Sequence, residues 1–219
     1  MLNHPFQLTE LTRLDDPLLP AWLDLYETSF IPQERLLVSY YLRLLKEKDR
    51  PENQRIHLLA AVDASGFLGG IIHYFDAGPA RVAALWYLAV HPSLRGKGLG
   101  SELYRALLQR LDPAATDLLL FEVEIPQLQP TSKEAELARR RIGFYQRLGA
   151  QLLDGIDYLQ VIGSHQPPLP MHVMVHRFIP LSPQQVYDRA KQIYADNLNR
   201  RGEVALLPRD QPSLPSTQT

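Results

Sequence analysis

The stretch "HPSLRGKGLGSELYRALLQRL", from His91 to Leu111, decides how the fold is interpreted. Three glycines stand at alternate positions, Gly96, Gly98 and Gly100, directly before an apolar periodicity that predicts a helix. Glycine weakens the start of a helix, because it has the most backbone entropy to lose and offers no capping side chain. We therefore expect this backbone to serve something other than helix formation.

The start of this helix has the chemistry of an anion site. The N–H groups of a first helical turn lack intrahelical acceptors and carry partial positive charge, so they attract anions. The glycines let a pyrophosphate approach the backbone, while Arg95 and Lys97 add charge and Ser101 adds a hydroxyl. The alternative, a tight loop that uses glycine only to turn, needs one glycine rather than three.

The segments around this stretch predict an α/β protein with a sheet at its centre. "VAALWYLAV" (82–90) is apolar almost throughout, which is typical of a strand buried on both faces. Asp63-Ala64-Ser65-Gly66 has the composition of a hairpin turn. The predicted strands lie at 6–11, on either side of that turn within 55–78, and at 82–90, 117–125, 150–162 and 171–179.

Helical spacing of apolar residues predicts further helices on both sides of this stretch. Ser182, Pro183 and Gln185 predict an N-cap, a first-turn proline and a capping box. We expect one domain over residues 1–180, a C-terminal helix within 181–200 packed on it, and a disordered tail over 201–219. The spacing of Leu137, Arg141, Tyr145 and Leu148 predicts a helix that ends at Gly149. The buried faces of the other helices are predicted to include Trp22, Leu23, Leu25, Tyr26 and Phe30; Leu36, Leu37, Tyr40, Tyr41, Leu44 and Leu45 in a helix from near Gln33; Leu99, Leu103, Ala106, Leu107 and Leu111; and Val186, Ala190, Ile193 and Leu198.

Composition excludes several classes of function. The 219 residues are 45% hydrophobic and 21% charged, which is typical of a globular protein. The chain has no cysteine, so disulfides, thiolate metal sites and cysteine nucleophiles are excluded. A net charge of -1 gives no reason to expect a nucleic acid or a membrane as partner. We find neither a signal pattern nor an apolar run of about 18 residues, and we expect a cytoplasmic protein whose partners are small molecules or proteins.

Two common phosphate motifs fit the glycines poorly. The pattern G-x-x-x-x-G-K-[ST] is absent, because Lys97 precedes Gly98 instead of following the last glycine. A Rossmann-type dinucleotide site remains a remote alternative, with Glu122 as the downstream acid. Its glycines would follow G-x-G-x-x-G, whereas these follow G-x-G-x-G and stand further from the preceding strand.

The pattern Arg95-x-x-Gly98-x-Gly100 resembles motif A of the GNAT superfamily of acyl-CoA-dependent N-acyltransferases. "RRIGFYQRLGAQLL" (Arg140–Leu153) is similar to motif B of that family, a helix with an aromatic-tyrosine pair followed by Leu-Gly and a strand. The order of elements also matches over roughly residues 5–180. The resemblance implies a mixed, mostly antiparallel sheet that is splayed around motif A, helices on both faces, and the possibility of a homodimer.

The resemblance also implies which residues hold acetyl-CoA or another acyl-CoA. The strand before the loop is expected to pair with the pantetheine arm, and the amides of the loop are expected to hold the pyrophosphate. The N–H of Val90 would polarise the thioester carbonyl. No metal is implied. The expected cofactor-binding residues are Leu88, Ala89, Val90, Arg95, Gly96, Lys97, Gly98, Leu99, Gly100 and Ser101.

Three residues are candidates for catalysis. Tyr145 occupies the tyrosine position of motif B, which the resemblance places near the cofactor sulfur, where a phenol can protonate the departing thiolate. Glu122 and Glu124 lie two apart at the end of a strand, so they are expected on one face. Either could bind an ammonium and take its proton. Glu122 is preferred as the less peripheral, and the alternative for both is a solvated strand end.

Other polar residues are weaker candidates for acceptor binding. The histidines His73, His172 and His176 lack metal-ligand spacing, and a structural role is the alternative for each. Glu34 and Arg35 occupy the region of the acceptor loop in the family, or they cap a helix. The sequence thus predicts transfer of acetyl from acetyl-CoA to a primary amine, with a small-molecule acceptor favoured over a protein. A non-catalytic acyl-CoA sensor or scaffold is the alternative.

Overall fold

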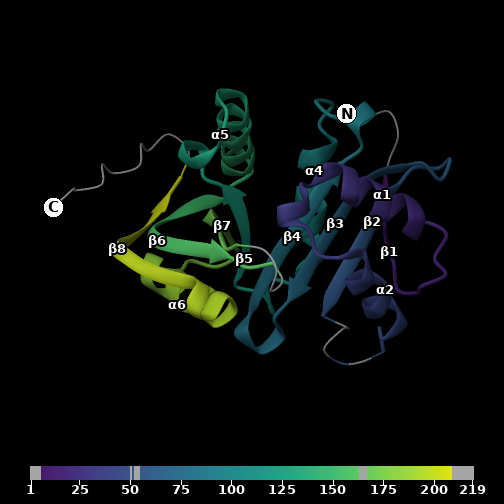
Figure 1. The fold of residues 1–219 in the computed structure, drawn as a ribbon. Helices are drawn as coiled ribbons and strands as arrows, with labels where there is room; N and C mark the ends of the chain where they lie inside the picture. The colour runs from purple at the N-terminus through teal and green to yellow at the C-terminus, as the bar shows by residue number, and fades with distance from the viewer. Residues whose placement is uncertain (1–5, 50, 52–54, 163–166, 209–219) are drawn as a thin grey trace. The chain divides into compact units, whose positions relative to one another are not determined.

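The computed structural model describes residues 6–49, 51, 55–162 and 167–208, and these form two compact units (Figure 1). Unit 1 lies within 1–79, 83–115 and 162–166, and unit 2 lies within 80–82, 116–161 and 167–219. The candidate anion loop belongs to unit 1, and the candidate catalytic residues belong to unit 2.

Unit 1 is built on four antiparallel strands in the order β1-β2-β3-β4. Its hairpin turn is confirmed: Gly66 has φ 87° and donates its N–H to the Asp63 carbonyl at 3.0 Å. The elements of unit 1 are β1 (Gln7–Glu10), α1 (Leu19–Ser29), α2 (Val38–Lys46), β2 (Ile56–Val62), β3 (Leu68–Asp76), β4 (Val82–Val90) and α4 (Leu99–Arg110).

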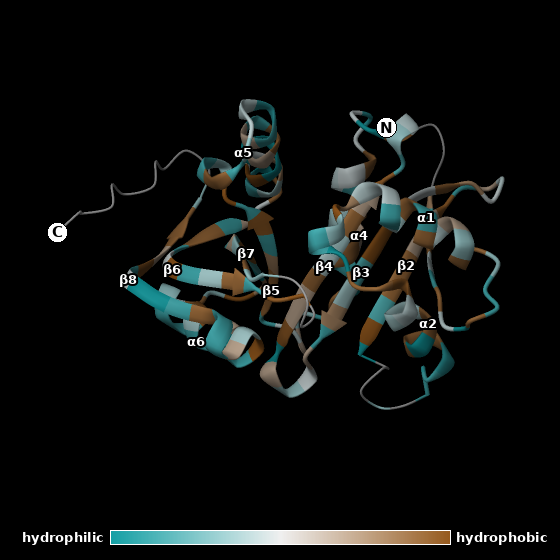
Figure 2. Ribbon diagram, viewed as in Figure 1, coloured by the Kyte–Doolittle hydropathy of each residue, from teal (hydrophilic) through white to brown (hydrophobic). Residues whose placement is uncertain are grey.

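Aromatic side chains fill the core between α1, α2 and the strands. Trp22, Tyr26 and Tyr41 are fully buried, and their rings lie within 5.0–5.7 Å of one another. The indole N–H of Trp22 donates to the Leu59 carbonyl at 3.0 Å, so its one polar atom is satisfied. Figure 2 shows the apolar residues that run along the strands of this unit.

Helix α4 packs closely on β3 because Gly70 has no side chain. A Cβ at Gly70 would lie 2.6 Å from Leu103 Cδ1 and 2.8 Å from the Ala89 carbonyl oxygen. The buried face of α4 consists of Leu99, Leu103, Tyr104 and Leu107. Leu99, Leu103 and Leu107 were expected there, and the close contact with β3 fixes the start of α4 beside the end of β4.

The second helix begins later than the sequence pattern predicts. Residues 32–34 form a single 3-10 turn, and α2 starts only at Val38. The Tyr87 hydroxyl donates to the Glu34 carbonyl at 2.7 Å and accepts from the Leu36 N–H at 3.3 Å. These bonds hold the segment outside a helix, and Leu37, predicted to be buried, is 75% exposed.

Unit 2 is built on four antiparallel strands in the order β5-β7-β6-β8. The capping box predicted at Ser182 and Gln185 is confirmed at the start of α6. The elements of unit 2 are β5 (Leu118–Glu124), α5 (Ser132–Arg147), β6 (Gln151–Gln160), β7 (Leu169–Arg177), α6 (Pro183–Tyr194) and β8 (Leu198–Leu207).

One detail of unit 2 differs from the prediction, whereas the helix predicted to end at Gly149 is confirmed. Helix α5 buries Ala135, Ala138 and Tyr145, whereas Leu137 is 50% exposed. The segment predicted as helix end and disordered tail forms β8, which pairs with β6 over residues 198–207. Backbone pairing stabilises a segment whose own side chains are mostly polar and exposed. The tail over 209–219 lies outside the described residues.

The predicted α/β class, with mostly antiparallel strands, is confirmed within each unit. The Rossmann alternative is wrong, because β3 and β4 pair antiparallel where that fold needs parallel strands. The predicted splay concerns the junction of the two units and stays a prediction. Within the described ranges, no helix combines the length and apolar composition that a membrane span requires.

Candidate functional site

The loop between β4 and α4 adopts a backbone that requires glycine. Gly96 has φ 74° and Gly98 has φ 92°, a region that residues with a Cβ rarely adopt. A Cβ at either position would meet no atom within 4 Å. Packing in the fold therefore does not explain the absence of side chains here, and the open space lies directly before α4.

The first turn of α4 offers backbone donors to that space. Gly98 is the N-cap and supplies no side-chain cap, and its carbonyl accepts from the N–H groups of Ser101 and Glu102. The N–H groups of Leu99 and Gly100 come before the first intrahelical bond, so helix geometry leaves them for an external acceptor. This end of α4 is suited to bind an anion.

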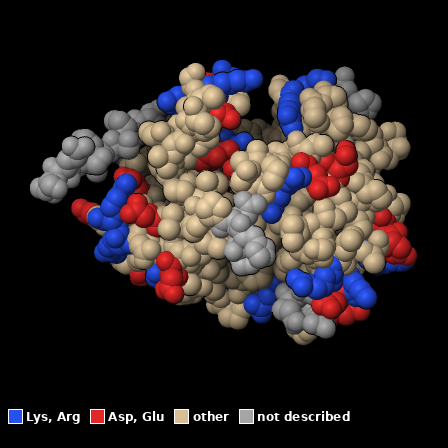
Figure 3. All heavy atoms as spheres, viewed as in Figure 1, with Lys and Arg blue, Asp and Glu red and all other residues tan. Residues whose placement is uncertain are grey.

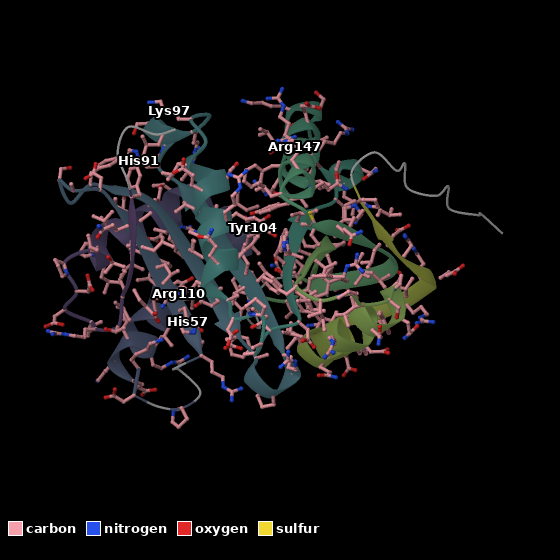
Figure 4. The ribbon with its side chains drawn as sticks, turned by 180° about the vertical axis from the view of Figure 1, so that it is seen from behind. His57, His91, Lys97, Tyr104, Arg110 and Arg147 are labelled. Atoms are coloured by element: carbon pink, nitrogen blue, oxygen red, sulfur yellow. The ribbon has the colours of Figure 1, made fainter. Side chains whose placement is uncertain are left out.

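Positive charge surrounds the loop. Arg95 and Lys97 are exposed, and Figure 3 shows Lys and Arg atoms at the top of unit 1, over this loop. Figure 4 shows Lys97 and His91 at one end of the unit and Arg110 and His57 at the other. The second group is engaged elsewhere, since Arg110 and His57 both pair with Glu10.

The register of β4 directs alternate backbone groups away from β3. The His91 N–H donates to the Gly69 carbonyl at 2.9 Å, so Ala89 also points its backbone groups toward β3. The N–H and C=O groups of Leu88 and Val90 point to the other side. The Val90 carbonyl accepts from Arg95 Nε at 3.1 Å, which agrees with that direction. The main-chain N–H and C=O groups of Leu88 and Val90 thus face away from β3, whereas those of Ala89 point toward β3.

In unit 2, Tyr145 lies on the buried face of α5 against β5. Its ring centroid is 4.4 Å from that of Phe121, and its side chain is only 8% exposed. Burial raises the pKa of Tyr145 to about 12, with Arg141 acting in the opposite direction. The phenol is therefore a weaker acid than a free tyrosine side chain.

The two glutamates of β5 have different partners. Glu124 forms an ion pair with Arg141 of α5. Glu122 lies beside two phenols, Tyr158 of β6 and Tyr194 of α6. Burial raises the pKa of Glu122, and the two phenols lower it by a smaller amount. A partly buried carboxylate with a raised pKa is suited to accept a proton near neutral pH, and Glu122 meets that description.

The structure gives the weaker candidates mainly structural surroundings. His73 is fully buried, and its Nδ1 forms a hydrogen bond with the Tyr41 hydroxyl at 3.2 Å. Burial lowers the pKa of His73 to about 3. Burial also lowers the pKa of His172 and of His176. Arg35 donates to the Glu27 carbonyl at 2.9 Å and so folds onto α1. Within the described ranges, no group of three or more acidic, histidine or cysteine side chains could hold a metal ion.

Sequence reasoning missed Tyr158 and Tyr194. Both are 7% exposed, and their ring centroids lie 4.5 Å apart. Tyr158 follows a bulge in β6, and Tyr194 is the last residue of α6, so only the folded structure brings them to Glu122. The one available signal was the helical spacing of Tyr194 from Val186 and Ala190.

Comparison with known proteins agrees with these features. The model of the acetyltransferase (GNAT) family matches residues 19–150. A GNAT-family protein from Bacteroides thetaiotaomicron is 26% identical, with a TM-score of 0.68 over 86% of this chain and 98% of that one. Comparison with curated protein sequences found no match.

More distant solved structures share the fold. A GCN5-related N-acetyltransferase from Kribbella flavida is 19% identical, with a TM-score of 0.55, and the match covers 79% of this chain and 98% of that one. An aminoglycoside 6'-N-acetyltransferase in complex with coenzyme A is 18% identical, with a TM-score of 0.54 over 80% and 99% of the two chains.

These features define an acyltransferase, a class of enzyme that uses an acyl-CoA as donor. The family match extends over more than half of the sequence, and the chain belongs to the GNAT acetyltransferase family. The residues present fit the donor: the open glycine loop and the α4 amides suit a pyrophosphate, and the outward groups of Leu88 and Val90 suit the amides of a pantetheine arm.

Proposed function

We propose that this protein transfers the acetyl group of acetyl-CoA to a primary amine of a small molecule. The observation that carries the proposal is the loop at Gly96 and Gly98, where a left-handed backbone faces open space at the start of α4. The hairpin glycine Gly66 has the same backbone and the same open space, but this loop has two such positions, and they stand beside Arg95 and Lys97 at the start of a helix.

The protein's own groups would hold the donor in two places. The amides of Leu99 and Gly100 would bind the pyrophosphate, and the cations of Arg95 and Lys97 would add to this attraction. The outward backbone groups of Leu88 and Val90 would bind the pantetheine amides as a further strand does. Bound acetyl-CoA supplies an activated acetyl thioester.

Glu122 and Tyr145 would each move one proton of the reaction. An amine reaches the protein as ammonium, and Glu122 would take its first proton, directly or through water. The amine nitrogen then bonds to the acetyl carbon and releases a second proton to water while the carbon-sulfur bond breaks, with the Val90 N–H stabilising the carbonyl oxygen. Tyr145 would give a proton to the departing sulfur.

We propose the cytoplasm as the location of this reaction and a homodimer as the assembly of the protein.

A substitution at Gly98 tests the donor site. Gly98→Val should weaken acetyl-CoA binding by about tenfold to a hundredfold, since hydrogen bonds to a charged group are worth about 1.5–3 kcal/mol each. The new side chain would occupy the open space and strain a backbone at φ 92°. Isothermal titration with acetyl-CoA measures the affinity, and release of free thiol against a panel of amines measures turnover.

Gly66→Val is the matched control for this experiment. Gly66 also has a positive φ, 87°, and a Cβ there also meets nothing within 4 Å, but it lies in the hairpin turn between β2 and β3. Both variants therefore carry similar backbone strain. Equal loss of acetyl-CoA affinity in both would contradict the donor site at α4. Binding of acetyl-CoA without turnover of any amine would favour the alternative function, a non-catalytic acyl-CoA sensor or scaffold.

Removal of the Tyr145 hydroxyl tests the proton donor. Tyr145→Phe should lower kcat by about 10- to 100-fold, at the low end of general acid catalysis because its pKa of about 12 makes it a weak acid. The KM for acetyl-CoA should stay unchanged. Steady-state kinetics decide the question, and a normal kcat would show that Tyr145 only packs against Phe121.

A further inference from the structure

A carboxylate and two phenols lie together in unit 2. Glu122 of β5 lies beside Tyr158 of β6 and Tyr194 of α6, and each phenol has its pKa raised by burial and by the charge of Glu122. The two rings are 4.5 Å apart and inclined by 47°. Both phenols stay neutral at physiological pH, so the cluster carries at most the single negative charge of Glu122.

Glu122 differs from the other partly or fully buried acids of this unit. Asp117 pairs with Arg81 and Arg189, Glu124 pairs with Arg141, and Asp154 pairs with Arg201. The groups that act on Glu122 are the two phenols and its own backbone. A buried carboxylate is stable only when it is paired or hydrogen-bonded. The cluster therefore lacks, within the described chain, the cation that the neighbouring acids have.

The hydroxyl of Tyr194 is also unsatisfied. Its oxygen is buried and has no well-formed hydrogen bond to any residue that the structure describes, although its contact with Glu122 is close enough to act as a hydrogen bond on the pKa of each group. A buried polar group without a partner costs about 1–3 kcal/mol. A ligand atom that bonds to both the carboxylate and the hydroxyl would recover that free energy.

A primary ammonium group has the matching chemistry. It carries one positive charge and three N–H donors, and the cluster offers three acceptor groups, one carboxylate and two hydroxyls. The faces of phenol rings attract cations as well. A neutral alcohol or a carboxylate ligand would leave the negative charge of Glu122 unpaired.

We propose that Glu122, Tyr158 and Tyr194 form the subsite for the ammonium group of the acceptor, so that the acceptor is a small cationic amine. This inference rests on the proposed function. Tyr158 and Tyr194 both lie outside residues 19–150, where the family model matches. Acceptor recognition is thus assigned in part to the segment of the chain after that match, including α6.

Hydroxyl removal tests the subsite. Spermidine, tyramine, glucosamine and L-lysine are first screened with acetyl-CoA for thiol release, and the best of them is the probe. Tyr194→Phe and Tyr158→Phe should each raise its KM by about tenfold to a hundredfold, as expected for one hydrogen bond to a charged group. The KM for acetyl-CoA should not change. Titration of the probe into protein saturated with free CoA should show the same loss of affinity without any chemistry.

Tyr187→Phe is the matched control. Tyr187 lies on the same helix with its ring under the guanidinium of Arg200, 5.0 Å from it, and the phenyl ring preserves that contact. This variant should keep the affinity for the probe. If Tyr194→Phe and Tyr158→Phe also keep it while acetyl-CoA binds and turns over normally, the subsite is overturned and the proposed function survives. If wild-type protein fails to bind acetyl-CoA, both are overturned.

Discussion

Glu122→Gln should lower kcat/KM for amine acetylation by roughly a hundredfold to ten-thousandfold, the range for loss of a general base. Glutamine keeps the size of the side chain and its place beside Tyr158 and Tyr194, but it cannot take a proton from the ammonium. The affinity for acetyl-CoA, measured by titration, should stay within a factor of about two. This is a smaller change than the loss of one hydrogen bond to a charged group would cause. The loss should therefore be confined to the step that involves the amine.

The pH dependence of the wild-type protein follows from the same carboxylate. Burial raises the pKa of Glu122 above its usual 4.5, and the base acts only when it is deprotonated. The rate kcat/KM should fall as the pH drops through that raised pKa, and this acid limb should vanish in Glu122→Gln. A profile with the same acid limb in both proteins would assign the limb to another group.

Stability should change in the opposite sense to activity. A carboxyl whose pKa is raised by folding contributes stability below its unfolded pKa, and that contribution is lost as the pH rises through the folded pKa. At pH 8 the ionised Glu122 therefore opposes folding, and Glu122→Gln should be at least as stable as the wild type in urea unfolding. A large loss of stability would show that the cluster with Tyr158 and Tyr194 is only structural.

Glu124→Gln is the matched control two residues along the strand. Glu124 pairs with Arg141, so its loss should weaken the contact between β5 and α5 and leave the pH profile of the reaction unchanged. The sequence favoured Glu122 over Glu124 only as the less peripheral of the two, because spacing along a strand predicts the face and not the partners of each side chain. If Glu124→Gln were the inactive variant, the general base would be Glu124.

The glycine loop could be predicted because its physics is local. Gly96, Gly98 and the amphipathic pattern of α4 are contiguous, and both the strand before them and the helix after them follow from short-range apolar patterns. The hairpin at Gly66 and the capping box at Ser182 were predictable for the same reason. In each case, the residues that decide the backbone lie within a few positions of one another.

The errors occur where distant residues decide the structure. Residues 32–37 have a helical apolar pattern, but hydrogen bonds from Tyr87 of β4 hold them outside a helix. The segment Asn199–Glu203 is polar and contains a glycine, so its own preferences do not predict a strand, yet pairing with β6 makes it part of β8. The Glu122 cluster was missed likewise, since Tyr194 reaches it only after α6 packs on unit 2.

Asp117→Ala should lower the free energy of unfolding by about 3 kcal/mol at pH 7, near the low end for breaking a buried ion pair because both arginines are partly exposed. The Asp117 side chain is 2% exposed. One of its oxygens accepts from Arg81 Nε at 2.8 Å, and the other lies 2.6 Å from Arg189 of α6. Alanine would leave two guanidinium groups without this partner.

The backbone of Asp117 strengthens the case that this residue organises unit 2. Its N–H donates to the Arg81 carbonyl at 2.7 Å, and its carbonyl accepts from the Phe178 N–H at 2.9 Å. Arg81 has φ 56°, an unfavourable conformation for a residue with a Cβ, so the surrounding contacts must hold it there. Loss of the carboxylate removes the hydrogen bond and the ion pair that join the Arg81 side chain to Asp117.

The pH dependence of this loss has a definite sign. The hydrogen bond from Arg81 lowers the pKa of Asp117 below its usual 3.8. A carboxyl whose pKa is lowered by folding contributes stability above its unfolded pKa, and this is lost as the pH falls through the folded pKa. The difference between wild type and Asp117→Ala in urea unfolding should therefore be the same at pH 7 and pH 5, and it should shrink below about pH 3.8.

Asp188→Ala on α6 is the control that separates a buried carboxylate from an exposed one. Asp188 is exposed and accepts from Gln184 Nε2 at 2.7 Å, so its loss should change the free energy of unfolding by no more than about 0.5 kcal/mol. The proposed donor site lies in unit 1, so the affinity of folded Asp117→Ala for acetyl-CoA should match that of wild type. Equal destabilisation by both substitutions would mean that the two arginines find other partners and that Asp117 does not organise unit 2.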